Sequence, residues 1–295
     1  MKNTIFTGAG VAIVTPMNED GSVNFDAYAD LIDFQIENKT DAIITCGTTG
    51  ESSTLSDDEH REVIKFAIEQ TAGRVPVIAG TGSNDTKYAI ELSQAAGEMG
   101  ADGLLLVTPY YNKTSQRGLV AHFGMIAESV KTPMILYSVQ SRTGVNIAPE
   151  TAFELSKYDN IVAIKEASGN ISQVAKIRAL CGDNLDVYSG NDDQIVPLLS
   201  LGGKGVISVL SNVAPEVAHN ICQFYFDGKV EESMKLQLEY LDLCNDLFVD
   251  VNPIPVKEAL NMMGMNAGPC RMPLYEMTDA AKDKLAATLA KHGLL

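Results

Sequence analysis

The chain lacks the features that would place it among disulfide-stabilised, zinc-binding, membrane or secreted proteins. Its five cysteines are far apart and form no Cys-x-x-Cys pair, so we expect free thiols and no disulfide framework. The four histidines are equally scattered, and we expect no metal site. No apolar run approaches the length of a membrane span, and the first residues lack a signal-peptide core. The expected location is therefore the cytoplasm, with no membrane partner.

Basic residues are scarce relative to acidic ones. The chain has 22 Lys and Arg against 38 Asp and Glu, which gives a net charge of −16 at pH 7. An anionic surface argues against nucleic acid as a partner, although it leaves room for a local cationic pocket that binds a small anion. Apolar residues make up 45% of the 295 positions, enough for a sizeable core in one or two domains.

Short apolar segments alternate with helical patterns over residues 8–226. Bounded by turn residues and rich in β-branched side chains, these segments are typical of buried strands. Their expected ends lie near Thr15, Thr48, Gly80, Thr108, Tyr137, Lys165, Gly190 and Ser208. Because a helix follows each strand, the strands should be parallel, and eight of them predict a (β/α)8 (TIM) barrel. A doubly wound sheet is the alternative, but no Gly-x-Gly-x-x-Gly follows the first strand.

After residue 227 the pattern changes to helices alone. We expect helices near 230–248, 254–263 and 278–291, separated by segments rich in Gly and Pro. The predicted organisation is therefore a catalytic barrel over 1–227 and a C-terminal helical domain over 228–295. These helices can pack on the barrel or form an oligomer interface.

Lys165 is the most unusual residue of the expected barrel, because it ends the apolar run of the sixth strand. Burial disfavours the charged form of an amine, and a neutral lysine can form an imine with a ketone or aldehyde. The alternative is a lysine that keeps its ammonium in water or in an ion pair. Glu166, one residue further, should point toward the helices, so we assign it no catalytic role.

Other polar groups are expected beside Lys165, because barrel enzymes build their sites at the carboxyl ends of the strands. Thr48 and Thr49, in a Gly-Thr-Thr-Gly turn, can bind a small carboxylate, although an ordinary polar turn has the same composition. Tyr137 is in phase with Lys165 and can relay protons, unless it is only a rim aromatic. Arg142 can bind a second carboxylate or be merely solvated. Together these groups fit a 2-oxo acid.

Four motifs occur in order along the chain: Gly47-Thr-Thr-Gly-Glu51, Tyr110-Tyr-Asn112, Tyr137-x-x-x-x-Arg-Thr-Gly144 and Ile164-Lys-Glu-Ala167. They resemble the motifs of the dihydrodipicolinate synthase family of pyruvate-dependent class I aldolases, which includes N-acetylneuraminate lyase. The resemblance runs from Gly8 to the C-terminus. It implies a barrel with a helical C-terminal domain, usually assembled as a homotetramer of two tight dimers. It also implies a covalent pyruvate imine and no cofactor.

The resemblance further implies an activity and the residues that carry it. The activity is the condensation of pyruvate with L-aspartate 4-semialdehyde to 4-hydroxy-tetrahydrodipicolinate, a lyase reaction of lysine and diaminopimelate biosynthesis. The implied catalytic residues are Lys165 for the imine and Tyr137, Thr48 and Tyr111 for a proton relay, with Tyr111 from a neighbouring subunit. The implied substrate-binding residues are Thr49 with Thr48 for the pyruvate carboxylate, Arg142 for that of the semialdehyde, and Gly190 and Ile207. Arg142 favours the synthase over its sugar-acid aldolase relatives.

The chain departs from the family pattern in two places. Ser138-Val139-Gln140 replaces a common Asn-Val-Pro, which bears on substrate choice more than on imine chemistry. In relatives inhibited by lysine, an acid stands at Tyr88 and a histidine at Asp57. The residues that do match the regulatory site are Ser52, His60, Asn84 and Tyr110. Without the acid, we expect weak or absent inhibition by lysine.

Two alternatives to the synthase remain from the sequence. One is another pyruvate aldolase, which cleaves a sialic acid or a 2-keto-3-deoxy sugar acid. The other is a catalytically silent barrel that binds a small acid or a partner protein without forming an imine. The sequence leaves monovalent cation binding and the exact oligomer open.

Overall fold

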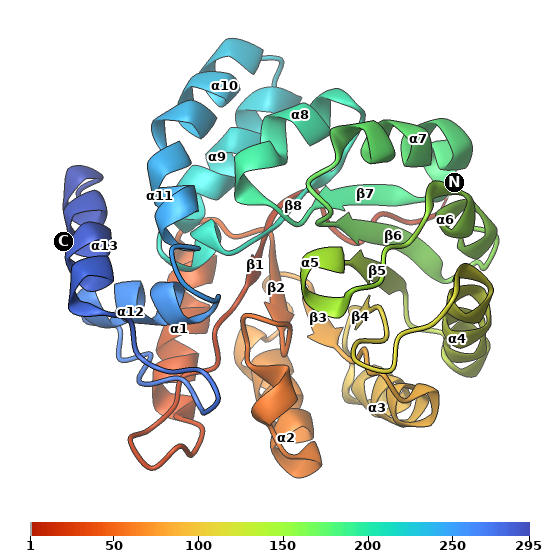
Figure 1. Cartoon of the computed structure of the whole chain (residues 1–295), viewed down its shortest axis with the longest axis horizontal. Coiled ribbons are helices and arrows are strands. Elements are labelled where there is room, and N and C mark those ends of the chain that lie inside the picture. Colours follow the sequence, from red (N-terminus) through yellow and green to blue (C-terminus); the bar gives the residue numbers. More distant parts are fainter. Residues whose placement is uncertain (1) are drawn as a thin grey trace.

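The computed structural model describes residues 2–295, and its centre is a closed barrel of eight parallel strands (Figure 1). The strands pair in chain order, and β8 pairs with β1 to close the barrel. Their bounds are β1 (Gly8–Ala12), β2 (Ala42–Thr45), β3 (Val77–Gly80), β4 (Gly103–Val107), β5 (Met134–Ser138), β6 (Ile161–Glu166), β7 (Asp186–Ser189) and β8 (Gly205–Ser208). The predicted (β/α)8 fold is confirmed. The first strand ends earlier than expected, at Ala12 instead of near Thr15.

Helices connect the strands and surround the barrel (Figure 1). They are α1 (Phe25–Glu37), α2 (Asp57–Thr71), α3 (Thr86–Met99), α4 (Gln116–Ser129), α5 (Gln140–Thr143), α6 (Pro149–Leu155), α7 (Ile171–Cys181), α8 (Ile195–Ser200) and α9 (Pro215–Phe226). The start of α2 shows how the sequence sets such a boundary. The Ser56 hydroxyl accepts from the Glu59 N–H and the Glu59 carboxylate accepts from the Ser56 N–H, which together form a capping box.

Two contacts lie toward the amino-terminal end of the barrel, opposite the strand ends that carry the site. Gly205 has φ +148°, and a Cβ there would lie 1.8 Å from the Gly8 carbonyl oxygen, so β8 can approach β1 only with glycine. Near the start of the chain, the Phe6 ring stacks on the Tyr188 ring at 4.4 Å, and the Tyr188 hydroxyl donates to the Phe6 carbonyl. The barrel interior is filled by apolar side chains that include Ile135, so it is a packed core.

An irregularity between β5 and β6 decides which residues share the barrel interior. Met134 pairs with Ile161, but the register then shifts, so that Tyr137 pairs with Lys165. Without this shift Tyr137 would pair with Ile164, and Lys165 would point to the other face, because side chains alternate along a strand. The shift therefore brings Tyr137 and Lys165 to the same side of the sheet, in agreement with the predicted phase.

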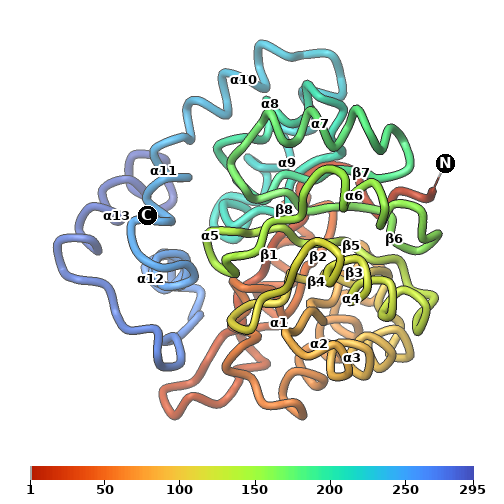
Figure 2. Tube along the Cα trace, turned by 45° about the vertical axis from the view of Figure 1, so that its right-hand side comes forward, coloured from red at the N-terminus to blue at the C-terminus, as the bar shows by residue number. Residues whose placement is uncertain are grey.

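The C-terminal helices form a layer on one side of the barrel (Figure 2). They are α10 (Val230–Glu239), α11 (Leu241–Asp246), α12 (Ile254–Met262) and α13 (Asp279–Lys291). One continuous helix over 230–248 is a wrong expectation, because the chain leaves helical geometry at Tyr240 (φ −95°, ψ 9°). The layer places the α11–α12 connection, Leu247–Pro253, against the loop after β2: Asn252 contacts Thr49.

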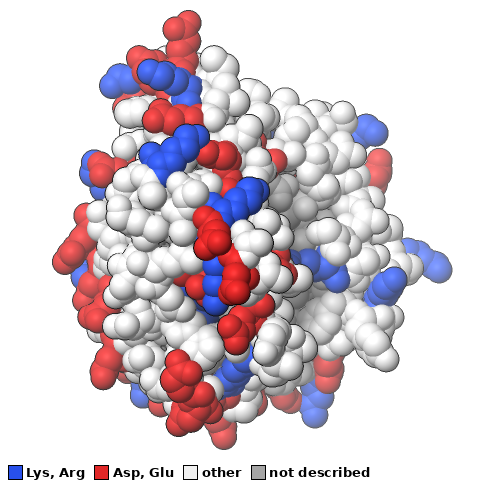
Figure 3. Space-filling view, turned by 60° about the vertical axis from the view of Figure 1, so that its left-hand side comes forward, with Lys and Arg blue, Asp and Glu red and all other residues white. Residues whose placement is uncertain are grey.

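The surface carries acidic and basic side chains side by side (Figure 3). Exposed ion pairs such as Lys39–Glu216 and Lys157–Glu154 account for part of this mixture. Within residues 2–295, no helix combines the length and apolar character that a membrane span requires.

Candidate active site

Lys165 lies at the carboxyl end of β6 with only 6% of its surface exposed. Its Nζ lies 4.3 Å from the centroid of the Tyr137 ring, close enough for a cation–π interaction. No acidic side chain lies within ion-pair distance of this nitrogen in the described part of the chain. The amine therefore forms no direct ion pair here, although it lies near enough to the buried Asp192 for the two charges to interact.

Gly190, at the end of β7, provides the space that the lysine side chain occupies. A Cβ at Gly190 would lie 3.2 Å from Lys165 Cε and 2.6 Å from Ala167 Cβ. Ile207, from β8, is buried in the cluster that fills the barrel interior together with Tyr137. The structure thus brings Lys165, Tyr137, Gly190 and Ile207 to one end of the barrel, as the strand order predicts.

Glu166 lies on the other side of β6, as expected. Its carboxylate accepts hydrogen bonds from the Ser168 N–H and hydroxyl and from Gln173 of α7. Burial raises the pKa of Glu166, and the hydrogen bonds from Ser168 and Gln173 oppose this shift. The carboxylate therefore anchors the loop after Lys165 to α7 and does not face the lysine.

Thr48 and Thr49 lie in the loop after β2, at the same end of the barrel. Thr48 lines a cavity of about 380 Å³ and also a small one of about 30 Å³ that Tyr137 lines. Thr49 is buried, and its Oγ1 accepts a hydrogen bond of 3.0 Å from the Asn252 side chain. Thr48 therefore offers a hydroxyl beside Tyr137, and Thr49 keeps its own hydroxyl hydrogen while it accepts from Asn252.

Arg142 lines the larger cavity with Thr48. It lies on α5, a single helical turn after β5 that the sequence analysis does not predict. The guanidinium donates from Nη2 to the Asn252 carbonyl at 3.1 Å, which fixes one side of it, while the side chain is otherwise exposed. The cavity thus has a cation at its rim and hydroxyl groups below it.

Tyr111 is the one predicted catalytic residue that the chain does not bring to Lys165. Its side chain is 92% exposed, and its backbone has φ +68°, in the left-handed region. Tyr110 next to it lines the cavity of Thr48 and Arg142. Tyr111 therefore does not face Lys165 of its own chain, and its role from a neighbouring subunit stays a prediction.

The residues that match a regulatory site adjoin the same cavity in part. Ser52, His60 and Tyr110 line it, as does Tyr88, whereas Asn84 is not among the lining residues. Burial lowers the pKa of His60, and its Nε2 lies 2.8 Å from the Gly80 carbonyl oxygen.

Asp57, where lysine-inhibited relatives have a histidine, is already bonded within the chain. Its carboxylate accepts from Arg61 and from the Tyr88 hydroxyl, at 3.0 and 2.9 Å. The Arg61 hydrogen bond lowers the pKa of Asp57. The acid at this position is therefore already bonded to two neighbouring side chains, Arg61 and Tyr88.

Two further residues, Asp192 and Asn252, surround this site without a signal in the sequence that marks them. Asp192 is buried beyond β7, and its Oδ2 accepts from the backbone N–H groups of Val209 and Leu210. Burial raises the pKa of Asp192, opposed by these hydrogen bonds and by the charge of Lys165. Asn252 contacts both Thr49 and Arg142, but its sequence signal, Asn-Pro between two helices, indicates only a connection.

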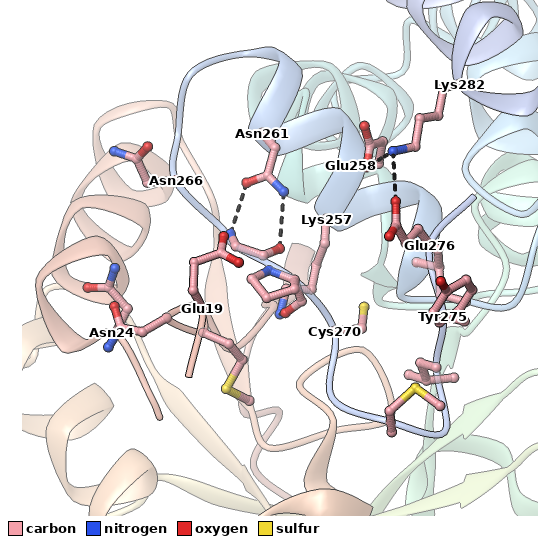
Figure 4. A pocket seen from close by; sticks show the side chains of 17 residues that line it. Glu19, Asn24, Lys257, Glu258, Asn261, Asn266, Cys270, Tyr275, Glu276 and Lys282 are labelled. Carbon is pink, nitrogen blue, oxygen red and sulfur yellow. Dashed lines mark hydrogen bonds and ion pairs between the residues drawn. The ribbon is translucent and has the colours of Figure 1, made fainter. Parts of the chain in front are cut away.

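A cavity larger than the two that Thr48 lines is found elsewhere in the molecule. About 710 Å³ in volume, it separates the loop Met17–Asn24 from α12 and the segment 266–276 (Figure 4). Lys282 bridges Glu258 and Glu276 at its rim, both at 3.6 Å, and Asn261 forms two hydrogen bonds with Gly268. None of the predicted catalytic residues lines it. Size alone therefore does not identify the active site here.

The fold and the Lys165–Tyr137 pair define the class of protein: a (β/α)8-barrel enzyme with an amine at the carboxyl end of its sixth strand. The chain belongs to the dihydrodipicolinate synthetase family, whose model matches residues 5–292.

Known relatives cover nearly the whole chain. It is 59% identical to a 4-hydroxy-tetrahydrodipicolinate synthase from Lachnoclostridium phytofermentans, over 99% of each chain. It is 58% identical to the enzyme of that name from Caldicellulosiruptor saccharolyticus, over 98% of each. A solved structure of dihydrodipicolinate synthase from Acinetobacter baumannii, chloride inhibited and complexed with pyruvate, superposes with a TM-score of 0.97 at 42% identity, over 99% of this chain and 100% of the other.

Proposed function

We propose that this chain is a 4-hydroxy-tetrahydrodipicolinate synthase, a lyase that condenses pyruvate with L-aspartate 4-semialdehyde in lysine and diaminopimelate biosynthesis. The observation that carries the proposal is the burial of Lys165 against the Tyr137 ring, beside a cavity lined by Thr48 and Arg142. The relatives of that name and the solved relative that binds pyruvate support it.

The proposed reaction begins when the Lys165 amine attacks the ketone of pyruvate and water leaves, which forms an imine. Loss of a proton from the pyruvate methyl group gives an enamine, whose carbon attacks the aldehyde of the second substrate. The amino group of the product then attacks the imine carbon and releases Lys165. No cofactor enters these steps, because the lysine itself supplies the electron sink.

The proton transfers are assigned to Tyr137, Thr48 and the Tyr111 of a neighbouring subunit. A positioned hydroxyl can pass a proton over hydrogen-bond distance, and Thr48 and Tyr137 line the same small cavity. The exposure of Tyr111 supports a homo-oligomer of at least two chains, proposed as a tetramer of two dimers. A fully active monomer would contradict this assignment.

Substrate binding is assigned to neutral hydroxyl groups for pyruvate and to a guanidinium for the semialdehyde. Hydroxyl groups of Thr48 and Thr49 bind the pyruvate carboxylate, and the Arg142 guanidinium binds the carboxylate of the semialdehyde. Gly190 and Ile207 shape the space around the imine. The barrel, proposed over 1–227, carries the chemistry, and the helices of 228–295 support it.

Two coupled assays test the proposal. One measures the condensation of pyruvate with L-aspartate 4-semialdehyde, and the other measures the cleavage of sugar acids to pyruvate. We expect turnover with L-aspartate 4-semialdehyde and none with N-acetylneuraminate or 2-keto-3-deoxy sugar acids. Turnover of a sugar acid alone would place the chain among the other pyruvate aldolases, and binding of pyruvate without turnover would indicate a silent barrel.

A further inference from the structure

Asn252 links the C-terminal helices to two groups of the proposed site. It lies in the connection between α11 and α12 and is 5% exposed. Its side-chain Nδ2 donates to Thr49 Oγ1 at 3.0 Å, and its backbone carbonyl oxygen accepts from Arg142 Nη2 at 3.1 Å. One residue thus joins the group proposed for pyruvate to the group proposed for the second substrate.

The hydrogen bond to Thr49 has a direction, and that direction matters for binding. A hydroxyl has one hydrogen to donate and lone pairs that accept. Because Thr49 Oγ1 accepts from Asn252, it keeps its own hydrogen free, and it donates to no other group among residues 2–295. A carboxylate requires a donor of this kind.

Contacts of Lys257, which follows Asn252 in the chain, also hold the loop that carries Thr49. Glu51, two residues after Thr49, accepts from the Lys257 ammonium at 2.8 Å, and Lys257 lies five residues after Asn252. Lys257 also donates to the Thr15 carbonyl at 3.1 Å. The loop after β2 is therefore attached to the C-terminal segment through Asn252, Lys257 and Arg271, and Asn252 is the residue that reaches the threonine hydroxyl.

We infer that Asn252 is a positioning residue for pyruvate: its side-chain N–H occupies one acceptor position of Thr49 Oγ1 and so leaves the Thr49 hydrogen for the substrate carboxylate. This inference rests on the proposed function. The two contacts of Asn252 can be tested apart. A substitution of the side chain removes the hydrogen bond to Thr49 and keeps the backbone carbonyl that accepts from Arg142. Pyruvate binding should weaken while binding of the semialdehyde stays the same.

A double-mutant cycle with Thr49→Val and Asn252→Ala tests this inference. The readouts are the pyruvate concentration that gives half-maximal imine trapping by borohydride, and the KM for each substrate in the coupled assay. Loss of one hydrogen bond should raise the half-maximal pyruvate concentration about fivefold in Asn252→Ala, with the semialdehyde KM changed less than about twofold. In the Thr49→Val background, Asn252→Ala should have no further effect.

Effects that multiply in the double variant, or an unchanged half-maximal concentration in Asn252→Ala, would overturn the inference. So would an equal rise of both KM values, which indicates a merely structural role. Absence of trapping in the wild-type protein would overturn the proposed function itself, and with it the inference.

Asn252→Asp is a second variant that keeps the size of the side chain and changes the donor into an acceptor. It should draw the Thr49 hydrogen away from the substrate and raise the half-maximal pyruvate concentration by roughly tenfold or more. Asn245→Asp, an exposed position on α11 with the same change in charge, should leave it unchanged. Equal effects of the two variants would assign the change to charge alone and contradict the inference.

Discussion

Lys257→Met should destabilise the protein strongly, because it breaks a buried ion pair. The Lys257 and Glu51 side chains are 2% and 0% exposed, and their charged atoms lie 2.8 Å apart. The ammonium also donates to the carbonyls of Thr15 and Pro269, so the substitution leaves a buried carboxylate and two carbonyls without this donor. Removing one partner of such a pair typically costs about 3–5 kcal/mol in the free energy of unfolding.

Urea denaturation followed by circular dichroism measures this loss, with a matched exposed pair as control. Lys157 and Glu154 lie 2.7 Å apart but are 57% and 51% exposed, so Lys157→Met should cost at most about 1 kcal/mol. The double variant Glu51→Gln with Lys257→Met should be more stable than Lys257→Met alone, since no unpaired charge remains buried. A loss below about 1 kcal/mol in Lys257→Met would refute the reasoning.

Three further predictions concern pH, space and regulation. The Arg271 hydrogen bond lowers the pKa of Glu59 from an ordinary 4.5 to about 2, so their pair stabilises the fold above pH 4.5 and loses this effect as the pH falls through about 2. The difference in unfolding free energy between wild type and Glu59→Gln should therefore shrink between pH 5 and pH 2, and a constant difference would contradict it. Gly190→Ala should reduce imine trapping about tenfold, because its Cβ crowds Lys165 Cε; unchanged trapping would argue against this contact. Lysine should inhibit weakly or not at all, since Tyr88 stands where inhibited relatives have an acid, and inhibition at sub-millimolar lysine in a steady-state assay would refute this.

The fold could be predicted from the sequence because a unit of one apolar segment and one helical segment is repeated along the chain. Each apolar segment is followed by at least one helix, and closure of eight such units into a barrel follows from their parallel order. Strand and helix ends were harder to predict. The first strand ends at Ala12 because pairing with β2 ends there, although the apolar sequence continues, and Tyr240 interrupts a segment whose composition is helical throughout.

The site was predictable in so far as its residues end strands. Lys165 and Tyr137 end adjacent strands, which the sequence indicates, but their pairing depends on the register shift after Met134, which the alternation of side chains does not reveal. Asn252 could not be found in this way, since its contact with Thr49 joins positions 203 residues apart and depends on how the C-terminal helices pack. The buried partner of Glu51 was missed for the same reason: Lys257 lies in a helix whose sequence gives no sign of which loop it faces.

The central claim is that Lys165 forms an imine with pyruvate, and mass spectrometry after borohydride reduction tests it directly. The wild-type chain incubated with pyruvate should gain the mass of one reduced pyruvate, on the peptide that contains Lys165. Lys165→Ala, with an unchanged unfolding profile, should gain none. An adduct of the same yield in Lys165→Ala, or no adduct in the wild type, would contradict the claim.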